Sequence, residues 1–297
     1  MNSPVLTNYA IKEVGNLLSK ISLRDQNTLI NAENAQVLKE SDEWSKLKSS
    51  KSDLSVEEKS FECYLKIRKI VDNLPLDSDA PHCYNHLIIE AVKSDHCLLV
   101  SILANRGANI HQVNSHNNRG LLHHCRSGRM VELLLSYGAD IHQKSTDGHT
   151  ALHSVSSISA ASALIENGLS IETKNNAGGT VLHCSMDLNL VSFFLKHGAR
   201  PNSTNNYGHS PMHLIATQGH WEIIYILLMA GCDVSIVGRD GMSAVSLARA
   251  VKTFVMAKPQ EESHVNSSKD LRRMEQTIEL LARYRCIMYS RAWQSSK

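Results

Sequence analysis

The chain has 297 residues, of which 42% are apolar and 20% charged, which is enough apolar sequence to bury a core. Lysine and arginine exceed aspartate and glutamate by 31 − 29 = +2, so no charge excess favours nucleic acid or an anionic membrane as partner. Aromatic residues make up only 5%, which argues against a platform for stacking bases.

Residues 1–80 are predicted to be helical and lack the periodicity of the rest of the chain. Amphipathic patterns run over 5–21 and 29–47, with a polar stretch at 46–53. Ser55 and Glu58 have the spacing of a capping box before an apolar helical run that Pro75 ends. We expect this region to cap the segment that follows; a separate partner-binding module is the alternative.

Residues 82–286 repeat one plan with a period of about 30 residues. The plan consists of a polar stretch, most often with a glycine, a four-residue signature that ends in histidine in four copies, an apolar run and a terminal glycine. The signature reads TALH at 150–153, TVLH at 180–183 and SPMH at 210–213, and more weakly GLLH at 120–123. The first copy has Ile89 in place of the histidine, which indicates a degenerate opening unit.

Each copy also carries start and stop signals for two helices. Thr150, Thr180 and Ser210 suit the N-cap of the first helix, and Pro211 fits its first turn. Asn118 stands where other copies have a turn glycine, because asparagine tolerates positive φ. Glycines suited to a left-handed C-cap follow the second helix: Gly107, Gly138, Gly168, Gly198 and Gly231. Helices this short need neighbouring copies for stability.

These segments resemble the ankyrin repeat and its T-P-L-H-x-A signature. The resemblance implies an all-α solenoid of five to six helix–turn–helix units with finger hairpins, preceded by the helical N-terminal region. The expected boundaries are 1–80 for that region or cap, 82–115 for degenerate repeat 1, then 116–145, 146–175, 176–205 and 206–238 for repeats 2 to 5. A C-terminal capping repeat at 239–286, with an insertion at 258–270, and a tail at 287–297 complete the chain.

The spacing from the signature to the terminal glycine varies between copies. It is 21 residues in the first and fifth copies (86 to 107 and 210 to 231) and 18 in the three between them. Three residues are therefore missing where the first helix ends. We predict a shortened first helix and a locally altered concave face in repeats 2 to 4, and, in the last unit, helices over 243–257 and 271–285.

The resemblance also implies roles for particular residues. The signature histidines, His123, His153, His183 and His213, are expected to bridge backbone groups at the helix start. Asn202 occupies a position that asparaginyl hydroxylase modifies in animal ankyrin proteins. Tyr207 and Arg119 are the expected hot spots, since both side chains combine apolar area with donors. Partner binding is expected at the finger tips and the exposed side of the first helices: Asn117, Arg119, Asp147, His149, Tyr207, His209, Thr217, Gln218, Asp240 and Met242.

Catalytic and metal sites are not indicated. Sixteen histidines and seven cysteines are present, but no CxxC pair occurs, and zinc needs four converging ligands. Cys125 and Cys184 follow signature histidines that already have a structural role, so helix packing is their expected use. GxGxxG does not occur. We expect no catalytic residue, no metal and no cofactor.

The expected function is a monomeric, non-enzymatic scaffold or adaptor that binds one or more proteins and no nucleic acid. Scattered cysteines, no signal peptide and no bilayer-length apolar run favour a cytoplasmic or nuclear location without membrane insertion. Two alternatives stay open: a secreted effector of an intracellular bacterium acting in host cytosol, and a substrate adaptor of a ubiquitin ligase. The sequence lacks an F-box-like triad and a SOCS-box-like C-terminus, which weakens the second.

Overall fold

The structure is a computed structural model that describes residues 13–14, 16–17, 64–71, 81–257 and 268–295. They fall into two compact units. Unit 1 comprises Met1–Gln143 with Ser159–Leu164, and unit 2 comprises Lys144–Ile158 with Ile165–Lys297. Among the described residues, extended pairing is limited to two single antiparallel bridges, Val113 with Gly120 and Val237 with Ser243. The predicted all-α architecture is confirmed.

Unit 1 is built from consecutive short helices. It contains α5 (Pro81–Lys93), α6 (Cys97–Asn105), η3 (Leu121–His124), α7 (Gly128–Ser136) and the middle of α8 (Ile158–Glu166). α5 packs on α6 and η3, and α7 packs on both α6 and η3. Before them, residues 64–71 are helical and bury Tyr64, Ile67 and Val71. The predicted helix over 29–47 and the capping box at Ser55 lie outside the described residues.

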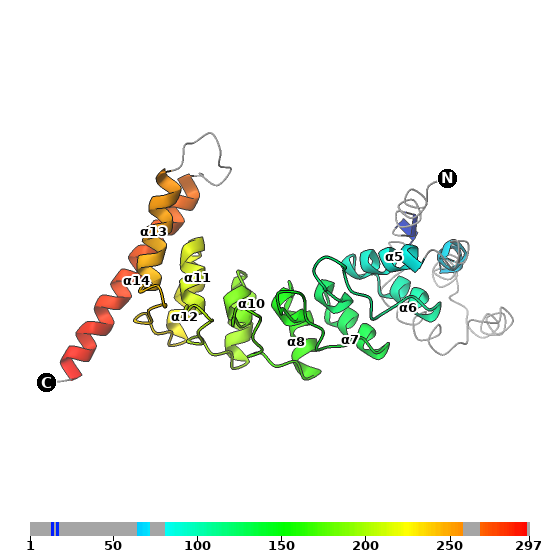
Figure 1. Cartoon of the computed structure of the whole chain (residues 1–297), viewed down its shortest axis with the longest axis horizontal. Coiled ribbons are helices and arrows are strands. Elements are labelled where there is room, and N and C mark those ends of the chain that lie inside the picture. The colour runs from blue at the N-terminus through cyan, green and yellow to red at the C-terminus, as the bar shows by residue number, and fades with distance from the viewer. Residues whose placement is uncertain (1–12, 15, 18–63, 72–80, 258–267, 296–297) are drawn as a thin grey trace, which may run out of the picture. The chain divides into compact units, whose positions relative to one another are not determined.

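Unit 2 also consists of consecutive short helices, and it ends in two longer ones (Figure 1). Its elements are η4 (Ala151–Ser154), α9 (Val181–Cys184), α10 (Leu188–Lys196), α11 (Pro211–Gln218), α12 (Trp221–Met229), α13 (Ala244–Ala257) and α14 (Ser268–Ser295). α14 packs against α11, α12 and α13, and Lys252 of α13 forms a 2.7 Å ion pair with Glu275 of α14. This helix therefore covers the end of the repeats in unit 2.

α14 is longer than the helix predicted over 271–285. It begins inside the expected insertion and continues through the expected tail to Ser295. The sequence after Arg285 contains no glycine or proline, so nothing local ends the helix there. The remainder of the expected insertion, 258–267, lies outside the described residues.

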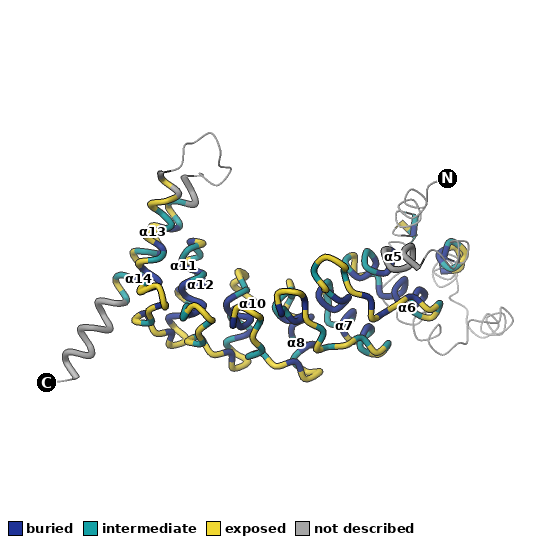
Figure 2. Tube along the Cα trace, in the orientation of Figure 1, coloured by how far each residue is buried: buried dark blue, intermediate teal, exposed yellow. Residues whose placement is uncertain are grey.

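The second helices of the five predicted repeats share one length and one buried face. α6, α7, α8, α10 and α12 are each nine residues long. In each, the third, fourth and seventh residues are buried, as Leu190, Val191 and Phe194 are in α10. Figure 2 shows buried and exposed residues alternating along these helices. This spacing places the apolar residues on one side of a helix. Three positions of each second helix therefore contribute to the repeat core, together with buried residues of the first helices such as Leu152 and Leu182.

The first helices of repeats 2 to 4 are short, as predicted. η3, η4 and α9 have four residues each, whereas α11 in repeat 5 has eight. In the short ones, the chain leaves helical geometry at Cys125, Val155 and Ser185, whose ψ angles are 136, 145 and 126°. Loss of three residues thus removes the last turn of the helix.

Candidate functional site

Two signature histidines of unit 2, His153 and His183, bridge neighbouring repeats. Nδ1 of His183 accepts the backbone N–H of Thr180 at 3.1 Å, and its Nε2 lies 3.1 Å from the carbonyl oxygen of His209 in the next repeat. Because Nδ1 is the acceptor, Nε2 carries the hydrogen and donates. His153 has the same arrangement with Thr150, at 3.3 Å, and with the carbonyl of Gly179, at 3.3 Å.

His213 completes only the first half of this arrangement. Its Nδ1 accepts the N–H of Ser210 at 3.1 Å, but its buried Nε2 has no partner at hydrogen-bond geometry. Burial lowers the pKa of His213, and the nearby backbone of Met242 and Ile236 only partly offsets this. Burial also lowers the pKa of His183. Both rings are therefore neutral near pH 7.

The backbone of the finger tips forms a ladder that runs from repeat to repeat. The N–H of Asn176 donates to the carbonyl of Asp147 at 3.0 Å, that of Asn206 to Ala177 at 2.9 Å, and that of Arg239 to Tyr207 at 2.8 Å. The side-chain amides of Asn176 and Asn206 add bonds of 2.9 Å each to the preceding finger. Since the tip backbones are paired with one another, the finger tips of unit 2 are held in an ordered conformation.

Tyr207 is the most prominent of these side chains. It is 63% exposed, while its backbone is held by its bond to Arg239 and by the side chain of Asn205, which accepts the Tyr207 N–H at 2.9 Å. Its ring centroid lies 6.4 Å from that of His209. Asp147 and Asp240 are also exposed. An exposed aromatic ring therefore projects from an ordered backbone, and other fingers of unit 2 present the exposed carboxylates of Asp147 and Asp240.

His209 is anchored rather than free. Its Nε2 lies 3.0 Å from Oδ2 of Asp240 on the next finger, and its ring stacks on His213 with centroids 5.1 Å apart. Oδ1 of Asp240 accepts the backbone N–H of Met242 at 2.9 Å. That bond, with a further contribution from His209, lowers the pKa of Asp240. Asp240 thus stays ionised and joins two fingers.

A family model described as ankyrin repeats (3 copies) matches residues 87–175 and again 154–238. Together the two matches span more than half of the 297 residues. This chain belongs to the ankyrin-repeat family. The ankyrin repeat is a protein–protein interaction module, so the chain carries an interaction domain.

Solved structures similar to this ankyrin protein include the ankyrin-repeat domain of Bcl-3, described as a unique member of the IkappaB protein family. The TM-score is 0.47 and the sequence identity 21%, and the alignment covers 65% of this chain and 93% of that one. A comparison with curated proteins found no match.

Cys184 and His149 lie close together, but they do not form a reactive thiolate–imidazole pair. Sγ of Cys184 lies 4.0 Å from Nε2 of His149 and 3.8 Å from Nδ2 of Asn175. Burial raises the pKa of Cys184, so the thiol is protonated and not nucleophilic near neutral pH. The ring of His149 stacks on His153 at 5.3 Å. Within the described ranges, no three His, Cys, Asp or Glu side chains are placed to hold a metal ion.

The other expected residues occupy varied places in the ankyrin units. Asn117 and Arg119 lie in the finger of unit 1, where Oδ1 of Asn117 accepts the Arg119 N–H at 3.2 Å. At the end of α11, Gln218 is exposed, whereas the half-buried Thr217 donates to the carbonyl of Leu214. No described helix has the length and apolar character needed to cross a membrane.

Asn202, the expected hydroxylation site, is exposed and links two repeats of unit 2. Its Oδ1 accepts the N–H of Asp233 at 2.8 Å, and its Nδ2 lies 3.3 Å from the carbonyl of Gly231. Hydroxylation of Asn202 stays a prediction, and intact-mass measurement on native protein would detect the added oxygen.

Sequence reasoning missed the asparagines that hold the fingers. Asn175 and Asn205 each accept from a residue four positions later, Gly179 at 2.8 Å and His209 at 3.0 Å. Asparagine recurs at the same place in both copies, so alignment of the repeats contains this signal. Its role was not evident because the bonds depend on the finger conformation.

Proposed function

We propose that unit 2 binds a partner protein through its finger face, which we define as Asp147, His149, Tyr207, His209, Asp240 and Met242. The observation that carries this proposal is the paired tip backbone, which orders Tyr207 while leaving 63% of that residue exposed. A tyrosine held in this way loses little conformational entropy on binding and offers both apolar area and a hydroxyl. The carboxylates of Asp147 and Asp240 add acceptors for donors on a partner.

A binding role without catalysis is the second part of the proposal. His153 and His183 are used in hydrogen bonds between repeats. Burial raises the pKa of Cys97 to about 11 and that of Cys232 to about 12, so both thiols are protonated near neutral pH. An adaptor or scaffold function needs only an ordered binding surface. The backbone hydrogen bonds between successive finger tips hold the finger face in such an ordered state.

The test is quantitative recovery of bound proteins from lysate of cells that express the chain, read by mass spectrometry. The variant carries Asp147→Ala and Tyr207→Ala, two exposed tip residues. A matched control carries Ser192→Ala and Lys196→Ala on the outer side of α10. We expect a protein that wild type and control retain and that the finger variant loses by about tenfold, equivalent to ~1.4 kcal/mol. Equal recovery by all three would contradict a finger-face site.

The identity of the recovered proteins also separates the two alternatives. A cullin-type or Skp-type subunit among them would indicate a ubiquitin-ligase adaptor. Partners from a host cell, in an infection setting, would indicate a secreted effector. Neither alternative is favoured by a feature of the described residues, so the general adaptor role is the one we propose.

A further inference from the structure

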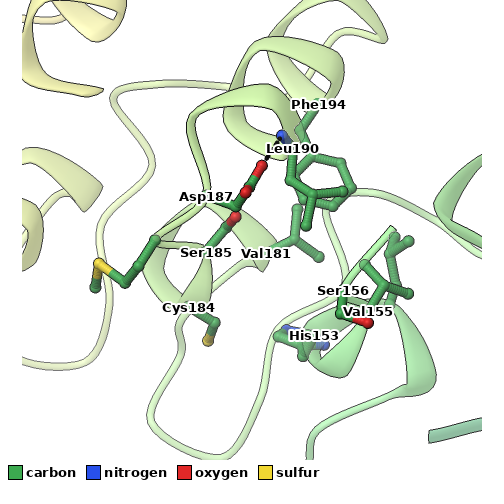
Figure 3. Close-up of a pocket in the computed structure, with 11 residues that line it drawn as sticks. His153, Val155, Ser156, Val181, Cys184, Ser185, Asp187, Leu190 and Phe194 are labelled. Carbon is green, nitrogen blue, oxygen red and sulfur yellow. Dashed lines mark hydrogen bonds between the residues drawn. The ribbon is translucent and has the colours of Figure 1, made fainter. Parts of the chain in front are cut away.

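A cavity of about 250 Å³ opens in unit 2 between repeats 3 and 4. Its apolar lining comes from Leu152, Val155, Val181, Leu190 and Phe194, and polar side chains, among them Ser156, Ser185 and Asp187, line the rest. Figure 3 shows Leu190 and Phe194 of α10 on one side of the cavity and Val155 and Ser156 of the preceding repeat on the other. None of the finger-face residues lines it. The cavity is therefore a surface separate from the finger face.

The cavity lies where the first helices are short. Val155 and Ser185 directly follow η4 and α9, the helices that lack their last turn compared with α11. In α11, the residues after His213 continue the helix, and Ile215 and Ala216 are buried. Without that turn, the apolar residues of η4, α9 and α10 are left with an unfilled space.

Two polar groups in the cavity lack a complete set of partners. The hydroxyl of Ser185 is buried without a hydrogen-bond partner, a state that costs folding free energy. The equivalent residues of repeats 2 and 3 are Cys125 and Val155, so the repeat does not require a hydroxyl there. Asp187 is exposed; its Oδ1 accepts the N–H of Leu190 at 2.9 Å, and no described residue donates to Oδ2.

We infer that this cavity receives the side chain of a tyrosine from a partner protein. The volume is below the roughly 300–1,000 Å³ of small-molecule sites, which favours a single side chain. The apolar part of the lining suits an aromatic ring, and the polar part suits its hydroxyl. A phenol can accept from the Ser185 hydroxyl, which turns about a single bond, and can donate to the Asp187 carboxylate. Tryptophan, lysine and arginine only donate, and phenylalanine does neither.

The inference rests on the proposed function for the existence of a protein partner, but its site can be tested without that partner. The probe is p-cresol, which has the tyrosine ring and hydroxyl, and toluene is the matched control. Both are titrated into the full chain labelled at the methyl groups of leucine and valine. We expect saturable shifts at Val155, Val181 and Leu190, and an affinity for p-cresol at least fivefold above that for toluene.

Ser185→Ala tests the polar part of the inference. We expect it to cut the preference for p-cresol over toluene at least threefold and to raise the midpoint of thermal unfolding, since it removes an unpaired buried hydroxyl. A rise in the midpoint shows that the weaker binding is not a folding defect. Absence of saturable shifts, or equal affinities for both probes in wild type, would overturn the assignment.

Competition then distinguishes a partner tyrosine from a free phenolic ligand. Saturating p-cresol should lower partner recovery by wild-type protein at least fivefold, whereas no competition would overturn the assignment to a partner side chain. The Asp147→Ala/Tyr207→Ala variant should bind p-cresol as wild type does. If that variant keeps its partner while p-cresol still competes, the finger-face proposal fails and the cavity assignment stands.

Discussion

His183 joins two repeats, because Nδ1 bonds within its own repeat and Nε2 bonds to the next one. Thr180 donates to Nδ1 and the carbonyl of His209 accepts from Nε2. Only the neutral ring with its hydrogen on Nε2 satisfies both bonds, since a protonated ring has no acceptor for the Thr180 N–H. The cohesion of unit 2 therefore depends on the protonation state of this residue.

Acid should weaken the fold through these histidines. Burial lowers the folded-state pKa of His183 and His213 below the ordinary value of 6.5, so the unfolded chain takes up protons first as the pH falls. Their contribution to stability is complete above pH 6.5 and is lost below it, by at most about 1.4 kcal/mol per pH unit per histidine. Urea unfolding at pH 7.5 and 5.5 checks this. His183→Gln/His213→Gln should show a smaller pH dependence; an unchanged one would contradict the account.

Substitution of two glycines of unit 2 distinguishes the cost of backbone strain from the cost of a clash between neighbouring fingers. Gly198 has φ +88° with open space where a Cβ would lie, whereas at Gly178, φ +75°, a Cβ would meet the amide of Asn206. Gly198→Ala should cost about 1–2 kcal/mol through its left-handed backbone alone. Gly178→Ala should cost at least about 1 kcal/mol more, because it displaces the Asn206 ladder bonds. Urea unfolding measures the free energy of unfolding of both variants. Equal losses in the two would argue that the hydrogen bonds between fingers do not stabilise the fold.

At the scale of elements, α12 differs from the other second helices on its outer side. Its fifth and ninth residues, Tyr225 and Met229, are 53% and 72% exposed. The corresponding residues of α10 are Ser192 and Lys196, so the repeat does not need apolar side chains there. Tyr225→Ser/Met229→Lys should change the free energy of unfolding by less than about 1 kcal/mol. A loss above about 2 kcal/mol in urea unfolding would show that these residues belong to the core.

The start and length of the first helices in repeats 2 to 5 could be predicted because their causes are local, whereas α5 of repeat 1 begins at Pro81, before the signature position at 86. Thr180 and His183 stand at cap spacing, and counting residues to Gly198 revealed the missing turn. Asn118 was likewise expected at positive φ and has φ 52°. The 4.0 Å approach of Cys184 to His149 could not be predicted, because the two residues lie 35 positions apart in different repeats. The cavity beside Ser185 could not be predicted for the same reason, since it depends on how one repeat packs on the next.

For the whole molecule, the near balance of charge limits how partners are attracted. Lysine and arginine number 31 and aspartate and glutamate 29, so long-range steering is weak. Partner affinity should therefore change less than about threefold between 50 and 300 mM salt. Calorimetry or surface plasmon resonance with the recovered partner measures this. A loss above about tenfold would mean that charged pairs, rather than Tyr207 and its hydrogen-bonding neighbours, dominate recognition.

The most direct test of the central claim places a photo-crosslinker at the finger face inside living cells. p-Benzoylphenylalanine replaces Tyr207 in one variant and Ser192, on the outer side of α10, in the control. We expect a crosslinked partner at position 207 and none at position 192. Crosslinking at 192 alone, or the same yield at both positions, would contradict recognition through the finger face.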